Sequence, residues 1–248
     1  MLNLETKILR INSCESTNTF AKELLSKSEP IEGTVIITDK QTKGRGQFGN
    51  SWQSENNKNL TFSIILKPKF LIPSHQFYLS KISAITSVLS LNECTNKQFS
   101  IKWPNDIYFN DKKIGGILIE NSITTNRIID SIIGIGININ QTFSEDLMIA
   151  TSLSEILNKP QKIEPILIKF LNTFEKLFIM LQNNKLEEIN SLYHSLLLGI
   201  NQKRKFIDTK LNLEISAILK GVNSIGQLHL YSNENDLFYN LKELKWIF

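Results

Sequence analysis

Apolar residues along the chain follow two spacings, which predict a mixture of strands and helices. The β-branched run Thr34–Thr38 and the apolar run Leu60–Leu66 are typical of strands, and the polar, glycine-rich segment Asp39–Lys58 separates them. Apolar positions recur at helical spacing between Pro73 and Cys94, which indicates an amphipathic helix. The segment Glu164–Leu181 carries a longer apolar stripe at the same spacing, so we expect a second helix there.

The middle of the chain predicts four further strands. Ser100–Trp103 is a short β-type run that Pro104 ends, and Ile107–Phe109 and Lys113–Glu120 flank a polar turn as in a hairpin. The next β-type run is Ile128–Ile139.

The run Ile128–Ile139 has two unlike faces. Side chains alternate along a strand, so one face carries Ile133, Ile135, Ile137 and Ile139, and the other carries Gly134, Gly136, Asn138 and Asn140. The isoleucine face is suited to a core. The glycine and asparagine face is suited either to the floor of a ligand pocket or to close packing against another backbone.

The last fifty residues consist of short β-type segments separated by Gly221 and Gly226. They predict a small all-β unit that leans on the rest of the protein, because its own core would be small. We therefore expect two domains, residues 1–198 and residues 199–248.

Composition narrows the functional classes. With 28 Lys and Arg against 24 Asp and Glu, the net charge of +4 is too small to indicate nucleic-acid binding. No apolar run approaches the roughly 20 residues of a membrane span. Two cysteines and three scattered histidines argue against a disulfide framework or a structural zinc site, and a reduced, cytoplasmic setting is expected.

The segment Lys43–Gly49 contains the spacing Gly-x-Gly-x-x-Gly. The dinucleotide-binding fold needs a helix that starts within the glycines, whereas turn-like residues follow here. Lys43, Arg45 and exposed backbone N–H groups could still neutralise a phosphate. A surface turn with incidental basic residues is an equally good interpretation of this segment alone.

Three other segments carry polar chemistry. The turn Lys102–Asp106 presents an amide and a carboxylate after Pro104, although ordinary turn chemistry explains it as well. The paired glycines of Asp111–Glu120 suggest that another group approaches that strand closely, and Lys113 stands beside them. Ser16 or Thr17 is expected to cap a helix, and with Asn18 could bind a polar ligand head.

Together and in this order, these segments resemble the biotin–protein ligase family. The resemblance rests on five motifs within the first 140 residues: Ser16–Asn18, Gln41–Gly46 with Trp52, Lys102–Asp106, Lys113–Glu120 and Gly134–Asn138. It implies an α+β fold with a mixed sheet and flanking helices, like the class II aminoacyl-tRNA-synthetase catalytic domain. By position and strand content, the C-terminal residues resemble the family's small SH3-like domain.

The resemblance implies a two-step reaction. Biotin reacts with ATP to give biotinyl-5′-AMP and pyrophosphate, and a lysine of a biotin carboxyl carrier domain then displaces AMP. ATP with Mg²⁺ is the implied cosubstrate, and the carrier domain of a carboxylase is the implied partner. No membrane partner is expected, and the protein is expected to be a monomer or a homodimer.

The resemblance also assigns roles to residues. Lys113, Arg45 and Asp106 are expected to be catalytic. Biotin is expected to contact Ser16, Thr17, Asn18, Gln41 and Gly116. The adenylate or ATP is expected to contact Gly44, Arg45, Gly46, Gln47, Trp52, Lys102, Asn105 and Asn138. No protein metal site is certain, although Asn138 could lie near a Mg²⁺ ion.

Two features depart from the family pattern. Many members carry further arginines where this chain has Gln47 and Phe48, so we hypothesise a weaker electrostatic grip on the adenylate. Only fifteen residues precede Ser16, too few for the helix-turn-helix domain of the bifunctional members, so a form that does not bind DNA is expected.

Two alternatives stay open at this point. One is a lipoate or octanoate transferase of similar fold, for which the polar set Ser16, Asn18 and Gln41 would have little purpose. The other is a biotin-sensing module without turnover.

Overall fold

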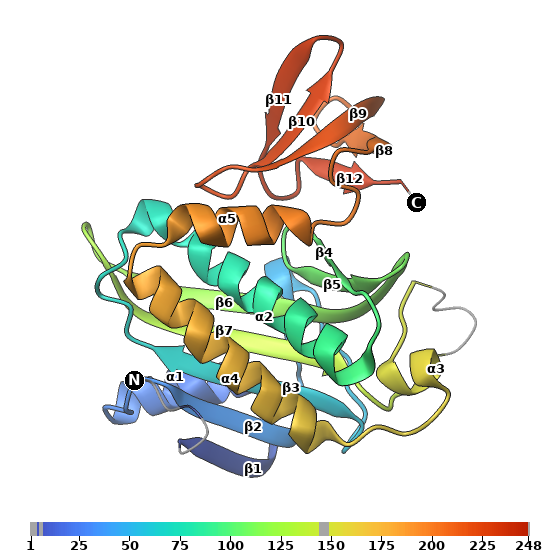
Figure 1. Ribbon diagram of the computed structural model, residues 1–248. Coiled ribbons are helices and arrows are strands. Elements are labelled where there is room, and N and C mark those ends of the chain that lie inside the picture. The colour runs from blue at the N-terminus through green and yellow to red at the C-terminus, as the bar shows by residue number, and fades with distance from the viewer. Residues whose placement is uncertain (1–3, 5–6, 144–148, 248) are drawn as a thin grey trace.

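A seven-stranded mixed sheet forms the larger part of the protein (Figure 1). The computed structural model describes residue 4, residues 7–143 and residues 149–247. The strand order is β1-β2-β3-β7-β6-β5-β4, with β1 and β2 parallel and the other neighbours antiparallel. The bounds are β1 Ile8–Cys14, β2 Thr34–Gln41, β3 Asn59–Leu66, β4 Ser100–Lys102, β5 Asp106–Phe109, β6 Lys112–Ile123 and β7 Ile128–Asn138.

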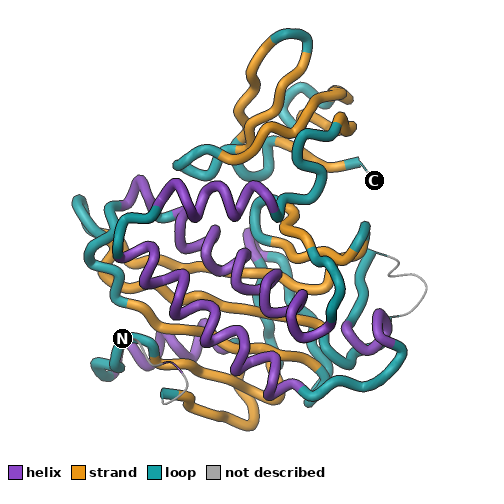
Figure 2. The backbone as a smooth tube through the Cα atoms, in the orientation of Figure 1, coloured by secondary structure: helices purple, strands orange, loops and turns teal. Residues whose placement is uncertain are grey.

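Helices cover both faces of this sheet (Figure 2). The helices α2 (Phe77–Thr95), α4 (Ile163–Gln182) and α5 (Leu186–Ser195) pack with the main core on one face. On the other face α1 (Thr17–Lys27) packs through Ala21 on Ile36, Ile65 and Ile132, a smaller separate cluster. The short helix α3 is Leu153–Leu157, and 3-10 turns span Gln47–Gly49 (η2) and Pro73–His75 (η3).

The helix α2 is buried on nearly all sides, so the expectation that it is amphipathic is wrong. Both α4 and α5 pack against it, and its serine and threonine side chains lie inside the protein. The hydroxyls of Ser83, Thr86 and Ser87 donate to carbonyls one turn earlier in the helix, which satisfies them without water.

A five-stranded antiparallel sheet forms the C-terminal part, in the order β11-β10-β9-β8-β12. The bounds are β8 Lys203–Asp208, β9 Leu213–Val222, β10 Leu228–Ser232, β11 Asn235–Tyr239 and β12 Leu244–Trp246. The mixed α+β fold with a C-terminal β unit is therefore confirmed, whereas the domain boundary at residue 198 stays a prediction. The last two of these strands are joined by a turn.

Polar contacts fasten the C-terminal sheet to the larger part of the protein, both at the β4–β5 turn and at α2. Trp103 Nε1 donates to the carbonyl of Gly226 at 2.9 Å. Lys81 on α2 is fully buried, and its ammonium donates to Asn190 Oδ1 at 2.5 Å and to the carbonyl of Asn223 at 3.2 Å. The same ammonium lies over the rings of three aromatic side chains.

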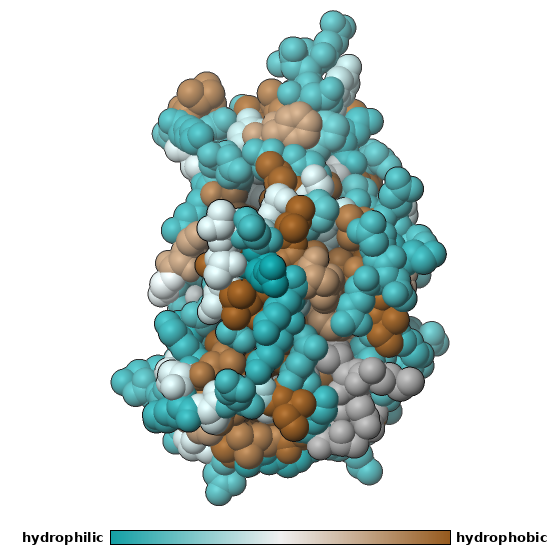
Figure 3. All heavy atoms as spheres, turned by 90° about the vertical axis from the view of Figure 1, so that its left-hand side faces the viewer, coloured by the Kyte–Doolittle hydropathy of each residue, from teal (hydrophilic) through white to brown (hydrophobic). Residues whose placement is uncertain are grey.

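The face shown in Figure 3 carries apolar side chains scattered among hydrophilic ones. Among the described residues, no helix combines the length and the apolar character that a membrane crossing requires.

Candidate active site

Three neighbouring strands build a polar floor on the face of the sheet that α1 covers. Gly136 of β7 pairs with Gly116 of β6 on one side and with Thr61 of β3 on the other. Gly134 pairs in the same way with Leu118 and Ser63. Ile133, Ile135 and Ile137 of β7 belong to the main core, so the apolar face predicted from their alternation is present.

The glycines leave room for the indole of Trp52, which lies directly on the floor. A Cβ atom on Gly136 would come within 2.5 Å of Trp52 Cε2, and one on Gly116 would lie 3.5 Å from Trp52 Cζ3. Trp52 Nε1 is buried and has no hydrogen-bond partner among the described residues. The floor is therefore a trough that a flat aromatic ring occupies.

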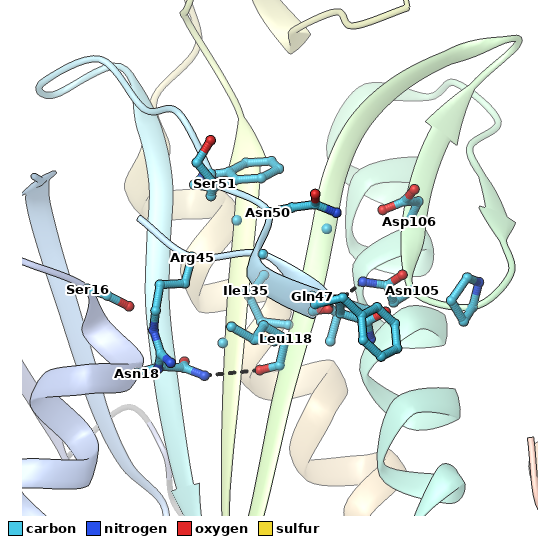
Figure 4. Close-up of a pocket in the computed structure, with 18 of the residues that line it drawn as sticks. Ser16, Asn18, Arg45, Gln47, Asn50, Ser51, Asn105, Asp106, Leu118 and Ile135 are labelled. Carbon is cyan, nitrogen blue, oxygen red and sulfur yellow. Dashed lines mark hydrogen bonds between the residues drawn. The ribbon is translucent and has the colours of Figure 1, made fainter. Parts of the chain in front are cut away.

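The glycine-rich loop is folded back on itself rather than open. Trp52 N–H donates to the carbonyl of Gly44 at 2.9 Å, and Gly46 N–H donates to that of Asn50 at 2.7 Å. No helix longer than the three-residue turn η2 starts within the glycines, which agrees with the rejection of a dinucleotide-binding loop. The loop thus carries Arg45 and Gln47 across the trough, as Figure 4 shows.

Four side chains form a polar network at the α1 end of the trough. Ser63 Oγ donates to Asn18 Oδ1 at 2.6 Å or to Thr17 Oγ1 at 2.7 Å. Asn18 Nδ2 donates to the carbonyl of Leu118 at 3.2 Å, a bond drawn in Figure 4, and to Glu120 Oε2 at 2.8 Å. These bonds occupy both ends of the Asn18 amide, so it fixes the network rather than offering free donors.

The expected N-cap position of α1 is confirmed, but the side-chain bond that usually accompanies it is not made. Ser16 is the N-cap residue, but its hydroxyl makes no capping hydrogen bond. Gln41 Oε1 instead accepts from the backbone N–H of Thr17 at 2.8 Å. The Ser16 hydroxyl thus remains available to a ligand, and Figure 4 shows it directed toward the cavity.

Two ion pairs hold the expected catalytic cations. The guanidinium of Arg45 makes two bonds to Glu120, at 2.6 and 3.2 Å, a bidentate arrangement that fixes its plane. The ammonium of Lys113 lies 2.5 Å from Asp106 Oδ1. Each pair is only partly exposed, so both cations are held in place before any substrate arrives.

Most of these groups line one cavity of about 260 Å³, whereas Ser63 and Glu120 do not line it but hold the lining residues Asn18 and Arg45. Ser16, Asn18 and Arg45 lie on one side of it, and Asn105 and Asp106 lie on the other (Figure 4). The structure brings together twelve of the residues to which roles were assigned: Ser16, Thr17, Asn18, Gln41, Arg45, Gly46, Gln47, Trp52, Asn105, Asp106, Lys113 and Gly116. Of the predicted floor, Gly134 and Gly136 line the cavity, whereas Asn140 is hydrogen-bonded to Gln161 instead. Their individual roles stay predictions.

Three predicted site residues do not line the cavity. Asn138 is buried and donates to the carbonyl of Thr151 at 3.1 Å. The Lys102 ammonium lies 5.2 Å from the ring centre of Tyr108, and burial lowers the pKa of this lysine, while the charge of Asp106 partly opposes the shift. Gly44 faces the other arm of the folded-back loop, where a Cβ atom would come within 2.2 Å of the Trp52 carbonyl oxygen.

The sequence prediction also missed contributors. Ser63 follows Asn59 and Thr61 at alternate positions of a strand, a polar pattern that could have marked the site face. Glu120 continues the alternation of Gly116 and Leu118 in the same way. No local signal marks Lys242, which reaches the cavity from the C-terminal sheet.

Comparison with known proteins agrees with this geometry. Residues 11–138 match the model of the biotin/lipoate A/B protein ligase family. The chain belongs to this family. It is 34% identical over 223 residues to the bifunctional ligase/repressor BirA of Bacillus subtilis, covering 88% of this chain and 67% of that protein. It is 27% identical over 226 residues to biotin–protein ligase 1, chloroplastic, of Arabidopsis thaliana, covering 85% of this chain and 59% of that protein.

Among solved structures, a biotin protein ligase from Aquifex aeolicus in complex with biotin and ATP superposes with a TM-score of 0.81 at 28% identity. The match covers 97% of this chain and 99% of that one, so it includes the C-terminal sheet.

Proposed function

We propose that this family member activates biotin with ATP to biotinyl-5′-AMP and transfers the biotinyl group to a lysine of a biotin carboxyl carrier domain. One observation carries the proposal. A single cavity places the polar network of α1 beside two pre-positioned cations, Arg45 and Lys113. The similarity to ligases whose solved structure holds biotin and ATP supports the same conclusion.

The first step joins two anions, so it depends on the two cations. Biotin's carboxylate oxygen attacks the α-phosphorus of ATP, and the bond from that phosphorus to the leaving pyrophosphate breaks. Arg45 and Lys113 then stabilise negative charge on the phosphate oxygens. Because Glu120 and Asp106 already orient these cations, little reorganisation is needed when the nucleotide enters.

The polar end of the cavity suits the ureido ring of biotin. The free hydroxyl of Ser16 and the amide of Gln41 lie at the start of α1, beside a network that holds Thr17 and Asn18 still. A ring with both donors and acceptors satisfies such groups, whereas the apolar dithiolane of lipoate would leave them unpaired. The geometry therefore favours biotin over lipoate or octanoate.

The second step requires a neutral amine. A carrier lysine has a free pKa of about 10.4, so a proton must leave before its nitrogen attacks the acyl carbon. The bond from that carbon to the phosphate oxygen then breaks, and AMP departs. Asp106 lines the cavity and its side chain is 17% exposed, so its carboxylate can orient the amine or accept the proton.

The described residues fit a magnesium ion poorly. No group of three His, Cys, Asp or Glu side chains among them lies close enough to hold a metal, and the Asn138 amide is engaged with Thr151. A Mg²⁺ ion that accompanies ATP would neutralise phosphate charge while the phosphates and water hold it. We place the reaction in the cytoplasm, where ATP and carboxylases meet.

The decisive experiment is pyrophosphate release from ATP with and without biotin, followed by the mass of a carrier domain. The proposal expects biotin-dependent release and a mass increase of one biotinyl group. Calorimetry with biotin and with lipoate distinguishes a biotin ligase from a lipoate or octanoate transferase. Biotin binding without pyrophosphate release would instead indicate a sensing module and refute the proposal.

A further inference from the structure

Lys113 lies on a face of β6 that regular strand geometry would not give it. Gly116 and Glu120 mark the cavity face of this strand, since the first lies beneath the Trp52 indole and the second holds the loop arginine. Regular alternation from Gly116 would place Ile114 on the cavity face and Lys113 on the core face. The structure shows the reverse: Ile114 is fully buried in the main core, and Lys113 lines the cavity.

A β-bulge between β5 and β6 produces this change of face. Ile107 of β5 pairs with Gly115, but the next residue, Tyr108, pairs with Lys113, so Ile114 is the extra residue. A bulge of this kind bends its strand and redirects the neighbouring side chains. The direction of the Lys113 side chain therefore depends on the bulge.

A separate segment lies beside the bulge where β7 no longer reaches. β7 ends at Asn138, and Lys113 lies beyond the last residue of β6 that pairs with β7 at this end. Lys113 pairs instead with Ala150 in a parallel bridge. Its N–H donates to the carbonyl of Ile149 at 2.7 Å, and its carbonyl accepts from the N–H of Thr151 at 2.9 Å. Residues 149–151, which we call the brace, thus bind both backbone polar groups of Lys113.

Two side chains fasten the brace to its surroundings. Asn138 Nδ2 donates to the carbonyl of Thr151 at 3.1 Å, and both residues are buried. Thr151 Oγ1 donates to Glu155 Oε2 of α3 at 3.0 Å. Asn138 therefore joins the end of β7 to the residue whose N–H holds the carbonyl of Lys113.

We propose that Asn138 is a positioning residue for Lys113, because it fastens the brace that holds the bulge and so turns the lysine toward the cavity. This inference rests on the proposed function, which gives Lys113 its part in adenylate formation. It replaces the direct contact with the nucleotide that the family resemblance implies for Asn138. The Asn138 amide is already bonded to Thr151, and the residue does not line the cavity.

The test compares two variants that each remove one asparagine donor. Asn138→Leu removes the bond to the brace. Asn140→Leu is the matched control, because Asn140 Nδ2 also donates to a backbone carbonyl, that of Gln161 at 2.9 Å, outside the brace. Steady-state pyrophosphate release gives kcat and KM for ATP, and hydrogen exchange reports on the N–H groups of Lys113 and Thr151. Lys113→Ala, alone and combined with Asn138→Leu, completes a double-mutant cycle.

For Asn138→Leu we expect kcat to fall about tenfold with KM for ATP unchanged, because a displaced lysine stabilises the transition state less well. The N–H groups of Lys113 and Thr151 should exchange about tenfold faster or more, because the brace opens locally. Asn140→Leu should change none of these quantities. In Lys113→Ala, adding Asn138→Leu should cause no further loss of activity, because Asn138 acts through that lysine.

Unchanged kcat in Asn138→Leu would overturn the inference, as would a full additional loss in the double variant. A raised KM for ATP with unchanged kcat would instead support direct contact with the nucleotide. If the wild-type protein released no pyrophosphate, the proposed function would fail, while hydrogen exchange would still decide whether Asn138 holds the brace. If Asn138→Leu did not fold, exchange in the wild type would decide, because unprotected N–H groups at Lys113 and Thr151 would refute the brace.

Discussion

Gly136 sets the height of the Trp52 indole above the sheet, so replacing it by alanine should lift the ring. The added Cβ atom would lie 2.5 Å from Trp52 Cε2 and 2.7 Å from Cζ2. The ring must therefore retreat by about 1 Å to reach ordinary contact. Because Trp52 belongs to a loop, the free energy of unfolding should fall by only about 1 kcal/mol, at the low end for overpacking.

The displacement of the Trp52 ring in Gly136→Ala should lower the activity much more than it lowers the stability. A displacement of about 1 Å in a site that positions two substrates can lower the rate about 10²-fold. The neighbouring Gly116→Ala is the matched control, since its Cβ would meet the same ring at an ordinary 3.5 Å. Urea unfolding followed by circular dichroism measures stability, and biotin-dependent pyrophosphate release measures activity. Equal activity in the two variants would show that the placement of Trp52 does not matter for adenylate formation.

Three further variants test other parts of the structure. Lys113→Ala should lower biotin-dependent pyrophosphate release about 10²-fold or more while exposed Lys112→Ala does not, and full activity would remove Lys113 from the mechanism. Gly134→Ala would bring a Cβ within 2.3 Å of Asn18 Oδ1. The free energy of unfolding should fall by about 2–3 kcal/mol, because the hydrogen bonds of the buried Asn18 amide are lost. An unchanged urea midpoint would contradict this. Burial lowers the pKa of Lys81 to about 8 from 10.5, so between these pH values the unfolded chain binds more protons and stability should rise with pH. Relative to Lys81→Met, the wild type should gain up to about 3 kcal/mol across that range, and parallel pH profiles would refute the assignment.

Local patterns in the sequence determined the elements that build the site. The alternation of isoleucine with glycine and asparagine in β7 predicted both its core face and its open face, because strand geometry fixes side-chain direction with a period of two residues. The order of the polar motifs predicted which loops and strands would meet, and all but three of the predicted site residues line the cavity.

The tertiary structure decided which partner each polar group takes. Gln41, rather than Ser16, satisfies the first N–H of α1, and Asn138 turns to the carbonyl of Thr151 instead of the cavity. These choices depend on which distant backbone groups the packing brings within hydrogen-bond distance, which periodicity does not encode. Lys242 depends most strongly on tertiary structure. Its ammonium lies over the ring of Phe48 and beside the cavity only because the C-terminal sheet packs against the rest of the protein.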